Sequence, residues 1–241
     1  MANSSCGIII LVTEMYQSSQ KGSAMVDQKL VVSLCDAAAR DMEIVGDSLY
    51  RTVRELTYID RDIDRKYQVV KSVYVKIDDT NYRIPILFDD GETNEFYDTA
   101  QSLVHYTVDC LYEYYSTVSE TLGGNFKYDP TSKYYTNNVG TDIKTTPVSD
   151  RFLKHTASQM RLASKHMDKF KCEVTDDNRL TFIDNILLYV DQKIYKLPVF
   201  IDDGRDNQYD ETPYGLIAAM FDCLDDYYRD AAYWYYRRNT D

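Results

Sequence analysis

Residues 73–115 read VYVKIDDTNYRIPILFDDGETNEFYDTAQSLVHYTVDCLYEYY, and residues 186–228 read ILLYVDQKIYKLPVFIDDGRDNQYDETPYGLIAAMFDCLDDYY. The two stretches align without a gap at a separation of 113 residues, with 14 identities in 43 positions. Most of the other positions exchange residues of similar character. A match of this length predicts an internal duplication, with two copies of one structural unit in the chain.

The first part of each copy predicts a β-hairpin. Residues 67–77 and 82–88 are rich in β-favouring residues and flank a polar turn, and residues 180–190 and 194–201 repeat the pattern. Pro85 and Pro198 stand inside the second strand of each hairpin. Because proline cannot donate to a strand ladder, this strand is expected at a sheet edge or at a bulge.

A helix is expected on either side of each hairpin. The helices that follow begin near an N-cap at Thr99 or Asp98 and at Thr212 or Glu211. Their apolar faces are predicted to contain Leu103, Thr107, Cys110, Leu111, Tyr114 and Val118, matched by Leu216, Met220, Cys223, Leu224, Tyr227 and Ala231. The helices that precede are expected at 28–58, with a break near Gly46 as one option, and at about 150–171, starting at Ser149-Asp150.

The sequence therefore predicts an α+β fold, in which two tandem repeats of an α-β-β-α unit form small antiparallel sheets covered by helices. The expected domains are an N-terminal strand or arm at 1–24, repeat domain 1 at 25–120, a linker or extended arm at 121–148, and repeat domain 2 at 149–241. A hairpin alone is marginally stable, so something must extend each sheet. The candidates are Ile8–Thr13 for the first copy and part of 121–148 for the second, or pairing of the two sheets about a pseudo-twofold axis.

Composition narrows the classes of function. The chain has 39 acidic and 27 basic residues, a net charge of -12, which argues against nucleic-acid and membrane partners. The apolar run Ile8–Val12 has no basic residue before it and is interpreted as a strand, not a signal peptide. No stretch approaches the roughly 18 apolar residues of a membrane-spanning helix. We expect an intracellular location, either cytoplasmic or virus-associated.

The five cysteines form no CxxC motif and are interpreted as reduced thiols. Cys110 and Cys223 occupy equivalent positions in the two copies, and the favoured interpretation is that both are small buried packing residues.

The strongest chemical candidate is the Asp-Asp-Gly loop after each hairpin, with Asp89, Asp90, Asp202 and Asp203 as weak candidates for metal binding. A tight turn is the favoured interpretation, because Asp accepts hydrogen bonds from the following backbone and Gly accommodates positive φ.

A second acidic motif has the spacing of a calcium loop. Asp60, Asp62 and Asp64 match the first three ligand positions, but Arg65 and Lys71 stand where glycine and glutamate belong. We interpret this stretch as a solvated connector.

Nothing in the sequence predicts a catalytic centre. GxSxG, HExxH, GxxxxGK[ST] and GxGxxG are all absent from the sequence. His105, His155 and His166 are interpreted as residues of helix surfaces or interfaces. No cofactor is expected, and the favoured interpretation is a protein that is not an enzyme.

Tyrosine is the unusual component, with 23 copies. Tyrosine combines a large apolar ring with a hydroxyl and is enriched in protein interfaces. Ordinary core packing combined with codon bias is the competing explanation. The candidate interface residues are Tyr114, Tyr115, Tyr134, Tyr135, Tyr227, Tyr228, Tyr233, Trp234, Tyr235 and Tyr236.

The function that these patterns favour is a non-enzymatic structural or protein-interaction protein that assembles with itself or with another protein. A viral structural protein is one form of this hypothesis, either capsid-associated or an occlusion-matrix-like lattice whose tyrosine-rich contacts would come apart in alkali, since tyrosine titrates near pH 10. The alternatives are a metal-dependent phosphoryl-transfer or nuclease-like enzyme that uses the Asp-Asp-Gly loops, and an acidic inhibitor or mimic that binds another protein.

Overall fold

A computed structural model describes residues 28–57, 68–88, 99–126, 146–171, 181–201 and 212–240. The elements are α2 (Gln28–Thr57), β1 (Gln68–Ile77), β2 (Thr80–Phe88), α3 (Ala100–Thr121), β3 (Thr146–Pro147), α4 (Asp150–Lys171), β4 (Thr181–Val190), β5 (Lys193–Ile201) and α5 (Pro213–Thr240). We call α2, β1, β2 and α3 the first half, and α4, β4, β5 and α5 the second half. The expected α+β class is confirmed.

The two hairpins have the same geometry. In β1–β2 Tyr74 lies opposite Arg83, and in β4–β5 the equivalent Leu187 lies opposite Lys196. Both ladders shift register at equivalent places, between Val69 and Lys71 and between Phe182 and Asp184. The turns also match, because Asp78 and Asp191 both adopt positive φ, 50° and 49°. Asp tolerates this left-handed conformation better than most residues.

The hairpins join into one antiparallel sheet with the strand order β2-β1-β4-β5. The predicted separate small sheets are therefore replaced by a single shared sheet. At the junction Val75 lies opposite Leu188, its own equivalent in the other half, with Tyr74 opposite Tyr189 and Lys76 opposite Leu187. This pairing places a local twofold axis between β1 and β4.

Two other segments were expected to add a strand to a sheet. From the predicted linker, β3 pairs with Gln68 and Val69 of β1, so it extends the first half and not the second. Residues Ile8–Thr13 lie outside the described residues.

The helices begin where the sequence indicates. Thr99 caps α3 in a reciprocal capping box with Ser102, and the Thr212 hydroxyl accepts a hydrogen bond from the Gly215 backbone at 3.2 Å. The backbone of Phe152 donates to the Ser149 hydroxyl at 3.2 Å at the start of α4. The long helix α2 continues through Gly46 without the break that was one option.

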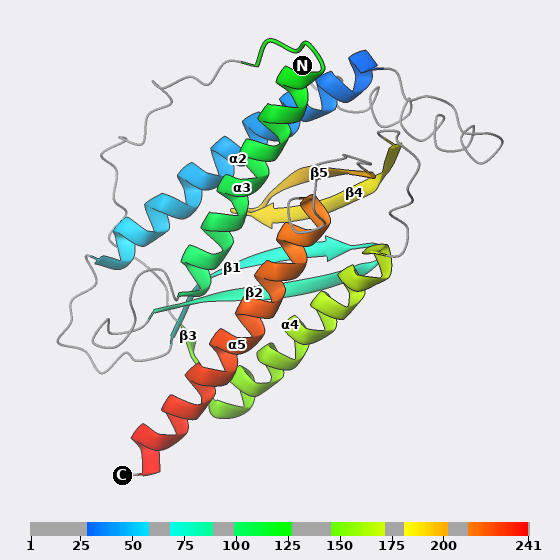
Figure 1. Cartoon of the computed structure of the whole chain (residues 1–241). Coiled ribbons are helices and arrows are strands. Elements are labelled where there is room, and N and C mark those ends of the chain that lie inside the picture. Colours follow the sequence, from blue (N-terminus) through cyan, green and yellow to red (C-terminus); the bar gives the residue numbers. More distant parts are fainter. Residues whose placement is uncertain are drawn as a thin grey trace.

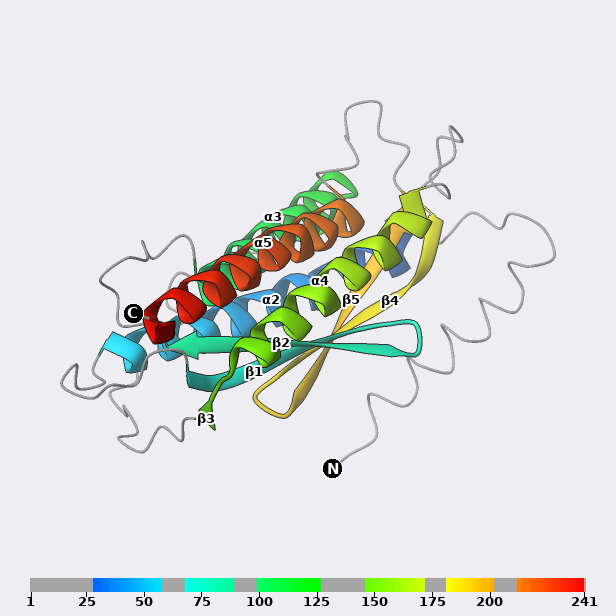
Figure 2. The same ribbon diagram turned by 90° about the horizontal axis from the view of Figure 1, so that it is seen from below.

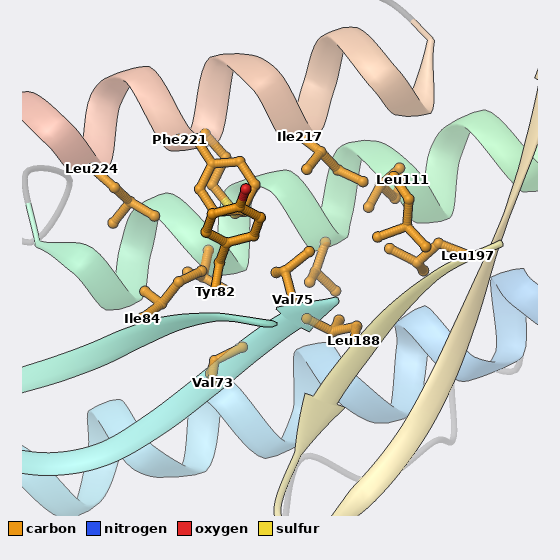
Figure 3. Packing of buried hydrophobic residues seen from close by; sticks show 14 of the residues in the cluster. Val73, Val75, Tyr82, Ile84, Leu111, Leu188, Leu197, Ile217, Phe221 and Leu224 are labelled. Atoms are coloured by element: carbon orange, nitrogen blue, oxygen red, sulfur yellow. The ribbon is translucent and has the colours of Figure 1, made fainter. Parts of the chain in front are cut away.

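The helices form one layer in the order α2-α3-α5-α4, with α2 against β5 and α4 against β2 (Figures 1 and 2). The sheet residues that face this layer are buried, and near the hairpin turns they alternate with exposed or half-exposed residues. Around the prolines of the edge strands, residues 84–87 and 197–199 are all buried. Figure 3 shows Phe221 and Leu224 of α5 above Tyr82 and Ile84 of β2. The core is thus built from both halves together.

On α3 and α5 several buried positions lie one residue away from the positions predicted to be buried. On α3 the buried positions include Val104, Val108, Leu111 and Tyr115, whereas Leu103 and Cys110 are only partly buried. The reason is that α3 contacts α2, α5 and the sheet, so its buried stripe is wider and differently centred than that of a helix with one neighbour. Cys223 is exposed, which corrects the expectation that it is buried.

The prolines occupy the predicted edges. Pro85 lies in β2 and Pro198 in β5, the two outer strands of the sheet. Among the described helices, none has the length and apolar character needed to cross a bilayer.

Candidate interaction surface

The tyrosine pair at the end of each duplicated stretch separates into a buried and a half-buried residue. Tyr115 and Tyr228 are fully buried and equivalent. The Tyr115 hydroxyl of α3 donates to the Pro198 carbonyl at 2.8 Å, and the Tyr228 hydroxyl of α5 donates to the Pro85 carbonyl at 2.6 Å. Each tyrosine therefore reaches the edge strand of the opposite half. These two predicted interface residues lie between the halves of one chain.

The neighbours of these tyrosines pack beside them. Tyr114 and Tyr227 are half-buried and make T-shaped contacts with Tyr115 and Tyr228, with ring centroids 5.3 and 5.0 Å apart. The candidates Tyr134 and Tyr135 lie outside the described residues.

A chain of polar side chains ties the first hairpin to α4. The Tyr82 hydroxyl lies 3.0 Å from Nδ1 of His166, and Nε2 of the same ring lies 2.9 Å from Asp78 Oδ2. This is the arrangement of an Asp-His-Tyr relay. However, burial and the negative charge of Asp78 raise the pKa of Tyr82, and the tyrosine is 6% exposed. The contact suits attachment of the two halves better than proton transfer to a substrate.

The second hairpin is held in the equivalent way by different residues. Asp191 forms an ion pair with Lys71 at 2.6 Å and accepts a hydrogen bond from Ser48 of α2. Ser48 of α2 thus contacts the turn aspartate of the second hairpin, as His166 of α4 contacts that of the first. The sequence identified the shared aspartates, but not their partners, because the partners differ between the halves.

A buried carboxylate joins α4 to α5. Asp225 accepts hydrogen bonds from Arg161 at 3.0 Å and from Arg229 at 2.6 Å. Burial favours a higher pKa for Asp225, but the hydrogen bonds and charges of the two arginines outweigh it and lower the pKa. The pair of arginines thus stabilises a packed helix interface.

The last turns of α5 carry an exposed group of aromatic side chains, which we call the aromatic segment (Tyr233, Trp234, Tyr235 and Tyr236). Tyr233, Trp234 and Tyr236 are 51%, 50% and 59% exposed, and Tyr235 is half-buried. Ala231 and Ala232 form the buried side of the helix just before them. The Arg237 guanidinium lies 5.0 Å from the centroid of the Tyr233 ring.

The first half has no aromatic residues at the positions equivalent to this segment. These positions at the end of α3 are Glu120, Thr121, Leu122 and Gly123, where the helix ends in a turn with Gly123 at φ 82°. Because α3 ends at Thr121 and α5 continues to Thr240, the aromatic segment has no counterpart in the first half.

The predicted Asp-Asp-Gly loops, with Asp89, Asp90, Asp202 and Asp203, lie outside the described residues. The strands that lead into them end at Phe88 and Ile201. The strand registers put these two ends on opposite edges and at opposite ends of the sheet, roughly 40 Å apart along the strands at about 3.3 Å per residue.

The described thiols are poorly suited to nucleophilic chemistry. Burial raises the pKa of Cys35 to about 12. Partial desolvation and nearby carboxylates raise the pKa of Cys110 and of Cys223, although the Cys223 side chain is exposed. Within the described ranges no group of three or more His, Cys, Asp or Glu side chains is arranged to hold a metal ion.

Comparisons with protein-family models, curated proteins and solved structures found no match to the chain.

Proposed function

We propose that this chain is a non-catalytic protein whose function depends on self-association, and that the aromatic segment of α5 is the contact. The observation that carries the proposal is the group of exposed aromatic side chains Tyr233, Trp234 and Tyr236, which have no counterpart in the first half. Large aromatic side chains contribute most when they are buried at the centre of an interface. A second copy of the same helix is the partner that fits best.

One pair of opposite charges beside the segment is self-complementary. We consider an antiparallel pair of α5 helices centred between Tyr233 and Trp234. In this pair Tyr233 of each copy lies opposite Trp234 of the other. The same centre places Asp230 of one copy opposite Arg237 of the other, twice by symmetry. A twofold contact requires this reciprocity.

The geometry of the sheet disfavours another common route of assembly. Strand addition needs free backbone groups on an edge strand. Here both edge strands contain proline, and the carbonyl groups of Pro85 and Pro198 already accept hydrogen bonds from Tyr228 and Tyr115. Association through a helix is therefore favoured over association through β-strands.

The matched hairpin registers, turns, caps and tyrosine contacts also support the finer hypothesis of two tandem α-β-β-α repeats that arose by duplication. In this view the fourteen shared residues mainly maintain the fold, and the residues that differ between the halves carry the function. The aromatic segment belongs to the second group.

The test uses the only tryptophan of the chain, Trp234. Raising the protein concentration should shift its fluorescence to shorter wavelength as the indole becomes buried, in parallel with the mass from sedimentation velocity. Asp230→Arg and Arg237→Asp should each weaken association at least several-fold, because each places like charges opposite each other. The double variant should restore association.

The matched control is Tyr106→Ser, which removes a tyrosine that is 70% exposed on α3. It should leave association unchanged, whereas Tyr236→Ser should weaken it. A monomeric wild type at high concentration would overturn the proposal. So would an oligomer that survives Tyr233→Ser combined with Tyr236→Ser while these variants keep their thermal stability.

A further inference from the structure

The face of the sheet that points away from the helices carries two rows of side chains. One row crosses the strands as Arg83, Tyr74, Tyr189 and Ile194, and the next as Asn81, Lys76, Leu187 and Lys196. All eight are exposed or half-exposed, while their neighbours along each strand that face the helices are buried. We call these eight residues the open face.

The open face differs in charge from the rest of the chain. It contains Arg83, Lys76 and Lys196 and no acidic residue, although the net charge of the chain is -12. Among the described residues, Lys76 forms a long ion pair of 3.8 Å with Asp79, which is fully exposed. The turn aspartates Asp78 and Asp191 are bound to His166 and Lys71.

Two tyrosines stand at the centre of this face. Tyr74 and Tyr189 lie directly opposite each other on β1 and β4, next to the local twofold axis. Directly opposite residues have Cβ atoms about 4.5–5.5 Å apart, so two tyrosine side chains stand side by side at the centre of the face. Tyr74 is 39% exposed, which leaves part of its ring available for stacking.

We propose that the open face binds single-stranded nucleic acid, with bases stacked on Tyr74 and Tyr189 and phosphates bound by Lys76, Lys196 and Arg83. Uncovered sheets bind single strands through stacking on aromatic side chains, and cations beside these side chains contact the backbone. Arg83 already donates from Nε to Ser72 at 2.9 Å, and its guanidinium lies 5.9 Å from the centroid of the Phe152 ring of α4, so its side chain is held at the β2 edge of the sheet.

The net charge of the chain opposes this binding only weakly at this face. The Debye length is about 8 Å at physiological ionic strength, so exposed charges farther away are largely screened. The acidic residues of the helices lie across the sheet from the open face. The sequence analysis argued against a nucleic-acid partner from the net charge of the whole chain. The structure shows the charge of each face, and the open face carries basic residues.

The experiment measures fluorescence anisotropy of a labelled oligo(dT) of about 15 nucleotides, close to the upper end of known site sizes. With about three phosphate contacts, raising salt from about 50 to about 200 mM should weaken binding roughly twenty-fold. Tyr74→Ser and Tyr189→Ser should each weaken binding at least about five-fold, since stacking of one base contributes that much or more. Lys76→Gln combined with Lys196→Gln should also reduce the salt dependence.

Matched controls separate this face from the others. Tyr106→Ser and Lys165→Gln remove exposed residues of the helical layer and should leave binding unchanged. Variants of the aromatic segment should also leave it unchanged, so failure of the proposed self-association would not affect this result.

Three outcomes would overturn the inference. One is no binding of the oligonucleotide by wild type at low salt. Another is equal binding by Tyr74→Ser combined with Tyr189→Ser when thermal melting shows a folded protein. The third is equally effective competition by poly-glutamate, which would identify an acidic protein as the ligand class.

Discussion

At the residue scale, several identities between the halves have a physical role. Asp78 and Asp191 adopt the left-handed turn conformation, and Thr99 and Thr212 cap helices. The pairs formed by Tyr115 with Pro198 and by Tyr228 with Pro85 connect the halves. Nothing in the structure explains why Cys110 and Cys223 are identical.

The reciprocal tyrosine bonds lead to a prediction of symmetry. Tyr115→Phe and Tyr228→Phe should each lower the free energy of unfolding by about 1–2 kcal/mol, because each leaves a buried carbonyl without its donor. Urea denaturation should give similar losses for the two variants. A loss for only one of them would contradict equivalent roles.

The same residues predict the behaviour in alkali. Burial raises the pKa of Tyr115 and Tyr228 well above the ordinary value near 10. Above about pH 10 the unfolded chain releases these protons while the folded chain retains them, so stability is full below this pH and falls above it. The slope should be about 1.4 kcal/mol per pH unit for each tyrosine. The double Phe variant should show a shallower decline in urea denaturation from pH 9 to 11.

At the element scale, the sequence predicted most helices and strands well because their signals are local. Periodicity, turn residues and caps lie within a few positions of each other, so both hairpins and the starts of three helices were found. The faces of α3 and α5 were less predictable, because burial there depends on neighbours distant in sequence, such as α2 against Val108. The break considered at Gly46 did not occur, since packing against α3 outweighs the low helix propensity of one glycine.

Two glycines of the helical layer should respond oppositely to alanine. A Cβ on Gly46 would lie 3.6 Å from Asp109 Oδ1 and farther from its other neighbours, an ordinary contact. Gly46→Ala should therefore stabilise the protein by about 0.5–1 kcal/mol through helix propensity. A Cβ on Gly124 would collide with the Ser119 hydroxyl and lie 2.9 Å from Val32 Cγ1, so Gly124→Ala should destabilise it. Thermal melting of both variants checks the signs, and a stabilising Gly124→Ala would contradict the packing.

At the scale of the whole molecule, the sequence left the relation between the halves open. Pairing about a twofold axis was one of three options, because the residues at the junction, Val75 and Leu188, resemble those of any buried strand. The candidate surface was predicted in part. The aromatic segment could be identified from the sequence because its four residues are consecutive. The open face could not, because its eight residues come from four strands and only the strand register brings them together.

The two halves share one sheet, and helices of each half pack on strands of the other. We therefore predict that the halves unfold together, although the sequence suggested two domains. Ile84 of β2 is fully buried beneath α5 of the other half. Ile84→Ala should cost about 2–5 kcal/mol, as truncation of a buried aliphatic side chain does. Because β1 and β4 form the centre of one sheet, hydrogen exchange of the slowest amides in β4 and β5 should accelerate by the same free energy as in β1 and β2. If exchange in β4 and β5 stays at the wild-type rate while β1 and β2 lose protection, the halves are separate domains and the junction between Val75 and Leu188 is not what holds the fold together.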